Sequence, residues 1–209
     1  MWLLIASLSA QAGALLGVDW VPFGRGDLAW VQDGELSGTG VAETDGLISG
    51  ALTAWGGWAD AHNAALLGIA GARLTTASSS DTLDEGTTVA AFRPSLDYRR
   101  YLHARAPGHV NAYGTVGIYG VFPAAKSWSN TYTTEEQTAM DTASAATRAQ
   151  ISGYGLRLGG GAELLFDNGL SIGARYLGVV HQSNATMDTT TTTSTFFYGE
   201  AAFVLGFSL

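Results

Sequence analysis

The sequence predicts an all-β fold, an eight-stranded antiparallel up-and-down barrel that crosses a membrane with its strands. Three observations predict it: segments in which apolar and small or polar residues alternate, connections that are alternately short and long, and a low content of charge. Period-two alternation is typical of a strand whose two faces meet different environments. Only 13% of the 209 residues are charged. No run reaches the roughly 18 apolar residues of a membrane helix.

Composition restricts the classes of function. The chain has no cysteine, which excludes disulfides and thiolate metal sites. Its net charge of −8 argues against nucleic acid, whose phosphates attract basic surfaces. A uniform composition predicts one barrel domain over residues 13–209. We expect residues 1–12 to be a secretory signal peptide cut after Ala12, because an apolar run precedes the small residues Ala10 and Ala12. A buried first strand is the alternative.

Eight segments alternate and are the predicted strands. In order, they cover residues 13–23, 47–59, 64–76, 88–102, 110–122, 151–166, 170–183 and 195–209. Three connections are short (60–63, 103–109 and 167–169), and Asp167-Asn168-Gly169 is a strong hairpin signal. The other connections are long (24–46, 77–87, 123–150 and 184–194). Outer-membrane barrels have short periplasmic turns and long extracellular loops, so the two classes of connection predict that arrangement.

Each predicted strand has an apolar face that we expect to contact lipid. Along the chain this face comprises Leu16, Val18, Trp20; Ile48, Leu52, Ala54, Trp58; Leu66, Ala70, Ala72, Leu74; Phe92, Leu96, Tyr98; Val116, Ile118, Phe122; Tyr154, Leu156, Leu158, Leu164, Phe166; Leu170, Ile172, Tyr176, Val180; and Phe203, Leu205, Phe207, Leu209. Ten residues of tilted strand give on the order of 25 Å of apolar band, which matches the height of such barrels.

The opposite face carries nearly all the charges of the strands. We expect it to fill the lumen as an ion-pair network, because eight strands enclose space only for side chains. The predicted interior polar network consists of Asp19, Arg73, Arg93, Asp97, Arg99, Arg157, Glu163, Arg175 and Glu200, joined by Trp55, Tyr113 and Tyr119. Arginine suits this place, since its planar guanidinium can satisfy two carboxylates while it stays charged.

Periodicity alone leaves open which face is outside. A soluble, lipocalin-like barrel would bury the apolar face. Two features favour the opposite orientation: the polar face has nearly matched charges, as buried charges require, and the aromatic residues of the apolar face fall into two groups. Such groups are expected where rings meet lipid headgroups. Trp20, Phe122, Tyr154 and Phe197 lie toward the loops, whereas Trp58, Tyr98, Phe166 and Phe207 lie toward the turns.

The last strand runs to the chain end with Phe203, Leu205, Phe207 and Leu209 on one face. It resembles the C-terminal strand of bacterial outer-membrane barrels, which the insertion machinery reads, although the final residue is Leu in place of the usual Phe. The whole layout resembles the small outer-membrane proteins of the OmpA, OmpX and OmpW type. This resemblance implies a location in the outer membrane, contact with its lipids and lipopolysaccharide, and a structural, surface-contact or minor solute-passage role without a cofactor.

The predicted loops are acidic or rich in threonine. Their carboxylates are Asp27, Asp33, Glu35, Glu43, Asp45, Asp81, Asp84, Glu85, Glu135, Glu136 and Asp141. Such residues can bind Ca²⁺ or Mg²⁺, but none has the spacing of a known calcium loop, and solvated loops are the simpler interpretation. Threonine-rich tracts in loops 123–150 and 184–194 predict mobile segments without a core.

One motif could carry chemistry. His181 and Ser183, two apart on a predicted strand, share a face, and a serine nucleophile needs such a base. The segment resembles the His-x-Ser-Asn motif of the PagL-type lipid A 3-O-deacylases. This resemblance implies His181 as base, Ser183 as nucleophile, Asn184 as oxyanion contributor and Glu200 as the carboxylate that orients the histidine. In the predicted register His181 and Ser183 face inward, whereas a β-bulge near Gly178 would turn them toward lipid. A polar strand end is the alternative.

Overall fold

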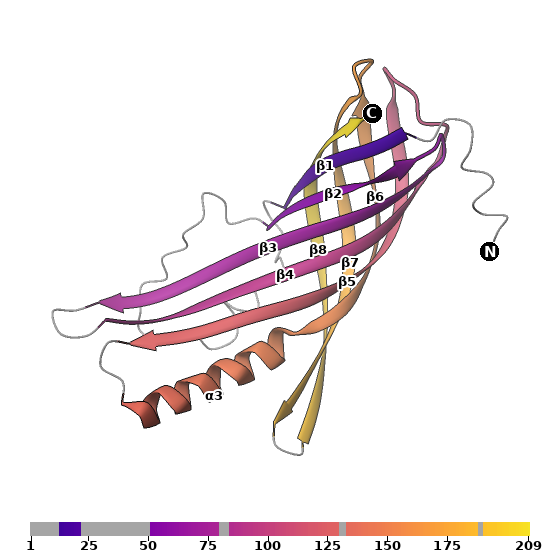
Figure 1. Cartoon of the computed structure of the whole chain (residues 1–209). Coiled ribbons are helices and arrows are strands. Elements are labelled where there is room, and N and C mark those ends of the chain that lie inside the picture. The colour runs from indigo at the N-terminus through magenta and orange to yellow at the C-terminus, as the bar shows by residue number, and fades with distance from the viewer. Residues whose placement is uncertain (1–12, 22–50, 80–83, 130–132, 188–189) are drawn as a thin grey trace.

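The computed structural model describes residues 13–21, 51–79, 84–129, 133–187 and 190–209. Eight antiparallel strands close in chain order into a barrel, which confirms the predicted all-β architecture (Figure 1). The strands are β1 (Gly13–Val21), β2 (Ala51–Ala59), β3 (Asn63–Ser79), β4 (Asp84–Tyr101), β5 (Val110–Ser129), β6 (Gly153–Leu165), β7 (Leu170–Met187) and β8 (Thr190–Ser208). One helix, α3 (Thr134–Ile151), lies between β5 and β6. In these described ranges, no helix is long and apolar enough to cross a membrane.

Three short connections lie at the end of the barrel where the chain terminates (Figure 1). The β2–β3 turn is organised by Asp60, whose carboxylate accepts hydrogen bonds from the backbone N–H of His62 (2.7 Å) and of Asn63 (2.6 Å). Slight burial would raise the pKa of Asp60, but these bonds and those from the Asn63 side chain outweigh it and lower the pKa. In the β6–β7 turn, Gly169 has φ of 86°, a conformation that favours glycine.

The strands differ in how far their pairing extends. Among the described residues, the β3–β4 ladder continues to Ser79 and Asp84, and β4 pairs with β5 as far as Glu85 and Ser129. β5 is 20 residues long, but its pairing with β6 ends at Val121 and Gly153. A tall β3–β4–β5 sheet and the β7–β8 hairpin therefore project beyond the closed barrel (Figure 1).

Much of the sequence that predicts mobile loops is ordered secondary structure. Residues 123–129, 184–187 and 190–194 extend β5, β7 and β8, since β-branched threonines such as Thr192 and Thr193 suit paired strands. Residues 134–151, also expected in a loop, form α3.

The start of α3 is a capping box. The Thr133 hydroxyl accepts a hydrogen bond from the Glu136 N–H (3.3 Å), and the Glu136 carboxylate accepts one from the Thr133 N–H (2.8 Å). These bonds lower the pKa of the fully exposed Glu136. The helix lies against β5, where the hydroxyls of Ser127 and Ser144 are 3.0 Å apart and buried.

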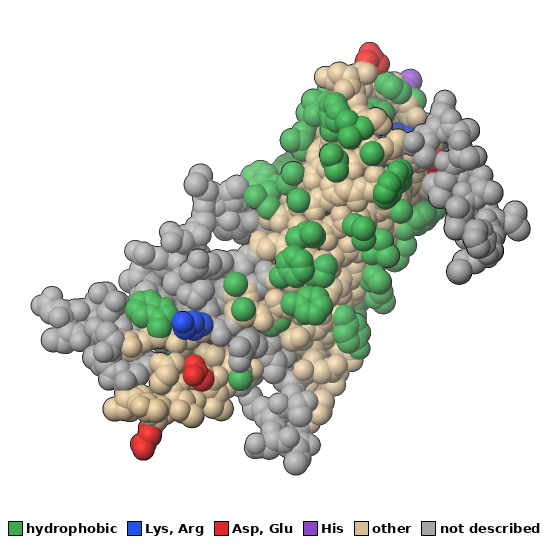
Figure 2. All heavy atoms as spheres, in the orientation of Figure 1, with side chains coloured by type: hydrophobic (Ala, Val, Ile, Leu, Met, Phe, Trp, Pro, Cys, Tyr) green, Lys and Arg blue, Asp and Glu red, His purple; other side chains and the backbone are tan. Residues whose placement is uncertain are grey.

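The apolar face of the strands is the outer surface of the barrel. Large apolar side chains stand exposed on it, including Trp58 (64%), Leu158 (68%) and Phe197 (77%). Figure 2 shows such side chains spread along the barrel wall, with Lys, Arg, Asp and Glu scarce on that wall. This orientation is the inverse of a barrel with an apolar core.

The predicted phase of one strand is wrong. The sequence assigns Leu66 and Ala70 of β3 to the outer face, but both are buried in the lumen, whereas Leu67 and Ile69 are exposed. Pairing explains the inversion, because Leu66 lies opposite Asp97 and Leu67 lies opposite Leu96, and cross-strand partners share a face. Both phases of this segment are apolar, so alternation alone could not set its register.

Candidate functional site: the charged lumen

Inward-facing glycines create the room for large polar side chains in the lumen. A Cβ atom at Gly17 would collide with the Trp55 ring, and one at Gly155 would collide with the Tyr119 ring. At Gly161 a Cβ atom would lie 2.7 Å from the Tyr113 hydroxyl. The missing side chains of these glycines thus leave space for the aromatic residues of neighbouring strands.

Two ion pairs cross the middle of the lumen. Arg157 on β6 binds the Asp97 carboxylate of β4 with two nitrogens, one of them Nε at 2.6 Å from Oδ1. On the other side, Arg175 Nη2 lies 2.5 Å from Asp19 Oδ2, and the Trp55 indole N–H donates to Asp19 Oδ1 over 2.8 Å. All four charged side chains are buried, so the charges compensate each other out of contact with water.

Glu200 links these pairs to the loop side of the lumen. Its carboxylate lies 3.3 Å from Arg93 Nη1 and 3.9 Å from Arg175 Nη2, and it is 1% exposed. Because Arg93, Arg175 and Glu200 come from β4, β7 and β8, the contact joins strands far apart in the sequence. The network therefore connects strands of the barrel wall to each other across the lumen.

On the turn side, Glu163 is the central acceptor. Its Oε1 accepts hydrogen bonds from Arg105 Nε (2.6 Å) and from the Tyr101 hydroxyl (3.1 Å). Arg105 also donates to the Ser208 hydroxyl over 2.8 Å. Arg105 belongs to the β4–β5 turn, so this side chain folds back and closes the turn-side end against β6 and the C-terminal strand.

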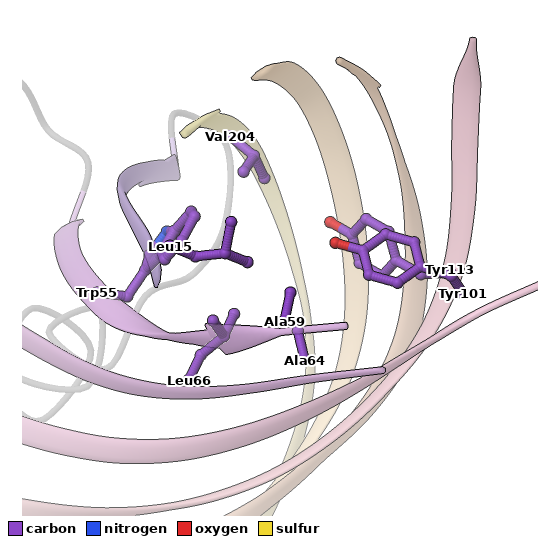
Figure 3. Packing of buried hydrophobic residues seen from close by; sticks show 8 residues of the cluster. All are labelled: Leu15, Trp55, Ala59, Ala64, Leu66, Tyr101, Tyr113 and Val204. Carbon is purple, nitrogen blue, oxygen red and sulfur yellow. The ribbon is translucent and has the colours of Figure 1, made fainter. Parts of the chain in front are cut away.

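Arg99 has a different environment from the other arginines. It is fully buried, and its guanidinium carbon lies 5.0 Å from the Trp55 ring and 4.8 Å from the Tyr113 ring. These rings reach into the lumen from β2 and β5, on opposite sides of the view in Figure 3. The nearest carboxylate oxygen, Oε2 of Glu163, is 3.9 Å from Arg99 Nη1. Aromatic faces, more than a carboxylate, hold this cation.

Toward the loops, the lumen holds a hydrogen-bonded chain of rings. The Tyr119 hydroxyl lies 3.0 Å from His181 Nδ1 and 3.1 Å from the Tyr198 hydroxyl. Arg93 lies over the Tyr119 ring at 5.3 Å. His181 is fully buried, and a Cβ atom at Gly153 would lie 2.5 Å from its Nε2. The cluster is packed polar structure that continues the ion-pair network.

The structure separates the residues of the His-x-Ser-Asn motif. His181 and Ser183 are buried on the lumen face, and β7 pairs regularly through Gly178 with both neighbours, so no bulge turns them outward. Glu200 pairs with Leu177, four residues from His181, which is roughly 13 Å along the strand. Asn184 is exposed and accepts a hydrogen bond from Thr193. These residues do not form a triad directed at lipid.

The structure gives the positions of eight residues of the predicted polar network. Asp19, Arg93, Asp97, Arg99, Arg157, Glu163, Arg175 and Glu200 are all buried in the lumen. The side chain of Arg73 lies outside the described set. The sequence prediction does not include Arg105, which it leaves in the short connection 103–109, or Tyr101, which lies in the predicted strand 88–102. The only sequence signal for Arg105 is its place among Ala104, Ala106 and Pro107, an apolar setting for a turn cation.

The other predicted sites have mixed outcomes. The aromatics Trp20, Trp58, Tyr98, Phe122, Tyr154, Phe166, Phe197 and Phe207 are all exposed on the outer face. Residues 1–12, the acidic residues of the first loop and Asp81 fall outside the described residues. Within the described part of the chain, no group of three or more His, Asp or Glu side chains could hold a metal ion.

No protein-family model matches the chain, and no curated protein matches it.

Proposed function

We propose that this chain is an integral outer-membrane β-barrel protein of bacteria with a structural and surface-contact role. The observation that carries the proposal is the inverted distribution of side chains. A closed barrel has exposed Leu, Ile, Val, Phe and Trp around its wall, whereas eight charged side chains of its strands are buried in the lumen. Water would not stabilise such a surface, but hydrocarbon would, and a closed barrel leaves no strand edge unpaired in lipid.

The two groups of exposed aromatic residues support a lipid boundary at each end. Trp58 and Tyr98 lie near the turns, and the Tyr98 hydroxyl donates to the Asn63 side chain over 2.6 Å. Arg100 is exposed beside them and also donates to Asn63 (2.7 Å). At the opposite side, Trp20 stacks on Phe203 with ring centroids 5.8 Å apart. Such amphipathic side chains suit the headgroup region.

The orientation follows from the ends of the barrel. The short turns and the C-terminal strand would face the periplasm, with that strand read by the barrel-insertion machinery. The tall β3–β4–β5 sheet, α3 and the β7–β8 hairpin would stand outside, among lipopolysaccharide. In this arrangement, the segment 1–12 would serve as a secretory signal. The layout is similar to that of small outer-membrane proteins of the OmpA, OmpX and OmpW type.

The filled lumen favours a structural role over solute passage. Ion pairs occupy its middle, and the Arg105–Glu163 contact closes its turn-side end. We therefore expect no discrete conductance steps in planar bilayers, and stepwise currents would favour a channel.

We also expect unchanged lipid A by mass spectrometry in cells that produce the protein. Loss of an acyl chain that depends on Ser183 would favour the hydrolase instead.

Fluorescence quenching by brominated lipid tests the membrane location. Trp58 is 64% exposed on the outer wall, whereas Trp55, three residues earlier, is 6% exposed in the lumen. In vesicles that contain lipids brominated along the acyl chain, the wild-type protein should be quenched. Trp58→Phe should remove a large part of the quenchable emission, and the matched control Trp55→Phe should remove almost none. A protein that stays folded and monodisperse in buffer without detergent would contradict the proposal.

A further inference from the structure

The described side chains of the lumen include one more cation than their carboxylates can neutralise. Among the described residues that face it, five arginines (Arg93, Arg99, Arg105, Arg157 and Arg175) meet four carboxylates (Asp19, Asp97, Glu163 and Glu200). Each carboxylate has a close arginine partner: Asp97 binds Arg157, Asp19 binds Arg175, Glu200 binds Arg93 and Glu163 binds Arg105. Arg99 is the cation left over.

The hydrogen-bond donors of Arg99 have no acceptor in the described part of the chain. None of its Nε, Nη1 and Nη2 atoms makes a hydrogen bond, and the neighbouring Tyr113 hydroxyl makes none either. Glu163 Oε2, at 3.9 Å, is beyond hydrogen-bond reach, and Oε1 of that carboxylate already accepts from Arg105 and Tyr101. Buried donors without acceptors are costly, so a further group is expected at this point.

The aromatic neighbours do not remove this requirement. The Trp55 and Tyr113 rings stabilise the positive charge through their π faces, whereas the five N–H bonds of a guanidinium point outward in its plane. A water molecule could accept one of these hydrogen bonds, but it would leave the positive charge unbalanced in a medium of low dielectric constant. A small anion accepts the bonds and balances the charge.

We propose that the lumen binds one small monovalent anion of halide size, held by the in-plane N–H groups of Arg99 and by the Tyr113 hydroxyl. Glu163 and Asp19 lie close to this place: Glu163 approaches Arg99, and Asp19 accepts from Trp55, whose ring contacts Arg99. Their negative charge disfavours multivalent anions such as phosphate or sulfate. Gly161, which has no side chain beside the Tyr113 hydroxyl, keeps that side of the site open for a small ligand. The bound anion would balance the positive charge of Arg99 and so neutralise the described charges of the lumen.

Crystals of the full-length protein grown in sodium bromide test this directly. We expect an anomalous bromide peak in contact with the Arg99 nitrogens and the Tyr113 hydroxyl in the wild-type protein. Tyr113→Phe keeps the ring against Arg99 but removes the hydroxyl, so it should lower the bromide occupancy severalfold. Tyr101→Phe is the matched control, because its hydroxyl is engaged with Glu163, and the peak should persist. Arg99→Met should abolish the peak.

Thermal unfolding in detergent gives a second readout that does not require crystals of a variant. Bromide at a hundredfold excess over its Kd should raise the wild-type Tm by on the order of 5 °C relative to sulfate at equal ionic strength. The rise should saturate and should be lost in Arg99→Met. Water without bromide beside Arg99 in the wild-type crystal, or a peak that survives Arg99→Met, would overturn the proposal. An unchanged peak in Tyr113→Phe would overturn the role of the hydroxyl.

Discussion

Arg105 and Glu163 connect the β4–β5 turn to the wall of β6 through a hydrogen bond of 2.6 Å between Nε and Oε1. Arg105 also reaches Ser208, the last residue of β8, so a single side chain joins a turn, a central strand and the closing strand. Its guanidinium lies 5.8 Å from the Tyr101 ring. The β4–β5 turn therefore contributes a side chain that closes the lumen.

Replacing Arg105 should destabilise the closed end of the barrel. Arg105→Gln leaves Glu163 with only the distant Arg99 as a cation, and the partly exposed pair should contribute about 1–3 kcal/mol to the free energy of unfolding. Urea unfolding of the protein refolded in vesicles measures this change in the free energy of unfolding. His103→Ala, an exposed change in the same turn, is the control and should alter the free energy by less than about 0.5 kcal/mol. Equal stabilities for both variants would show that Arg105 does not close the lumen.

The ion pair between Asp97 and Arg157 should behave as a coupled unit. Asp97→Asn leaves the Arg157 charge buried without a carboxylate, which should cost about 3–5 kcal/mol. Adding Arg157→Met should recover a large part of that loss, because the remaining charge disappears. A double-mutant cycle by urea unfolding measures the coupling energy. Strictly additive losses would mean that the two side chains do not interact across the lumen.

The sequence specifies the barrel more completely than it specifies each register. On β1 and β8, one face is apolar and the other contains Asp19 or Glu200, so alternation decides which side is inside. On β3 the run Ala64-Ala65-Leu66-Leu67 is apolar in both phases, and only pairing with Asp97 and Leu96 sets it. The inward charges could be predicted because a charged residue on a strand shows which of its two faces is inside the barrel. On β3, both faces of the apolar run are similar, so the sequence does not show which one faces inward.

Outside the closed barrel, the sequence was less informative. Threonine-rich composition predicts mobile loops, yet Thr192 and Thr193 are paired in a hairpin, where β-branched residues are favoured once a partner strand is present. The sequence Thr133-Thr134-Glu135-Glu136 does contain the capping-box spacing that starts α3. Arg105 could not have been placed, because its role depends on a turn conformation that brings residues from three strands together.

Inward and outward glycines should respond in opposite ways to the same substitution. Gly155→Val forces a side chain into the Tyr119 ring, and overpacking of a filled lumen should cost about 3 kcal/mol or prevent folding. Gly114→Val lies on the next strand, where the nearest atom to an added Cβ is 3.9 Å away, and should be neutral or slightly stabilising. Heat-modifiable migration on gels and urea unfolding compare the two. Loss of folding in both variants would contradict the assignment of faces.

The attachment of α3 should depend on pH through Glu136. Its pKa is lowered below the ordinary value of 4.5 by hydrogen bonds from Thr133, so the ionised form stabilises the folded helix. This contribution is fully present above about pH 4.5 and is lost as the pH falls through the lowered pKa of the folded state. Hydrogen exchange of α3 amides, corrected for intrinsic rates, should therefore accelerate at acid pH. Glu136→Gln keeps a capping side chain without a titratable group, so its protection should vary much less with pH, whereas Glu136→Ala should be less protected at every pH. The same acid-dependent loss of protection in Glu136→Gln would show that another group controls the helix.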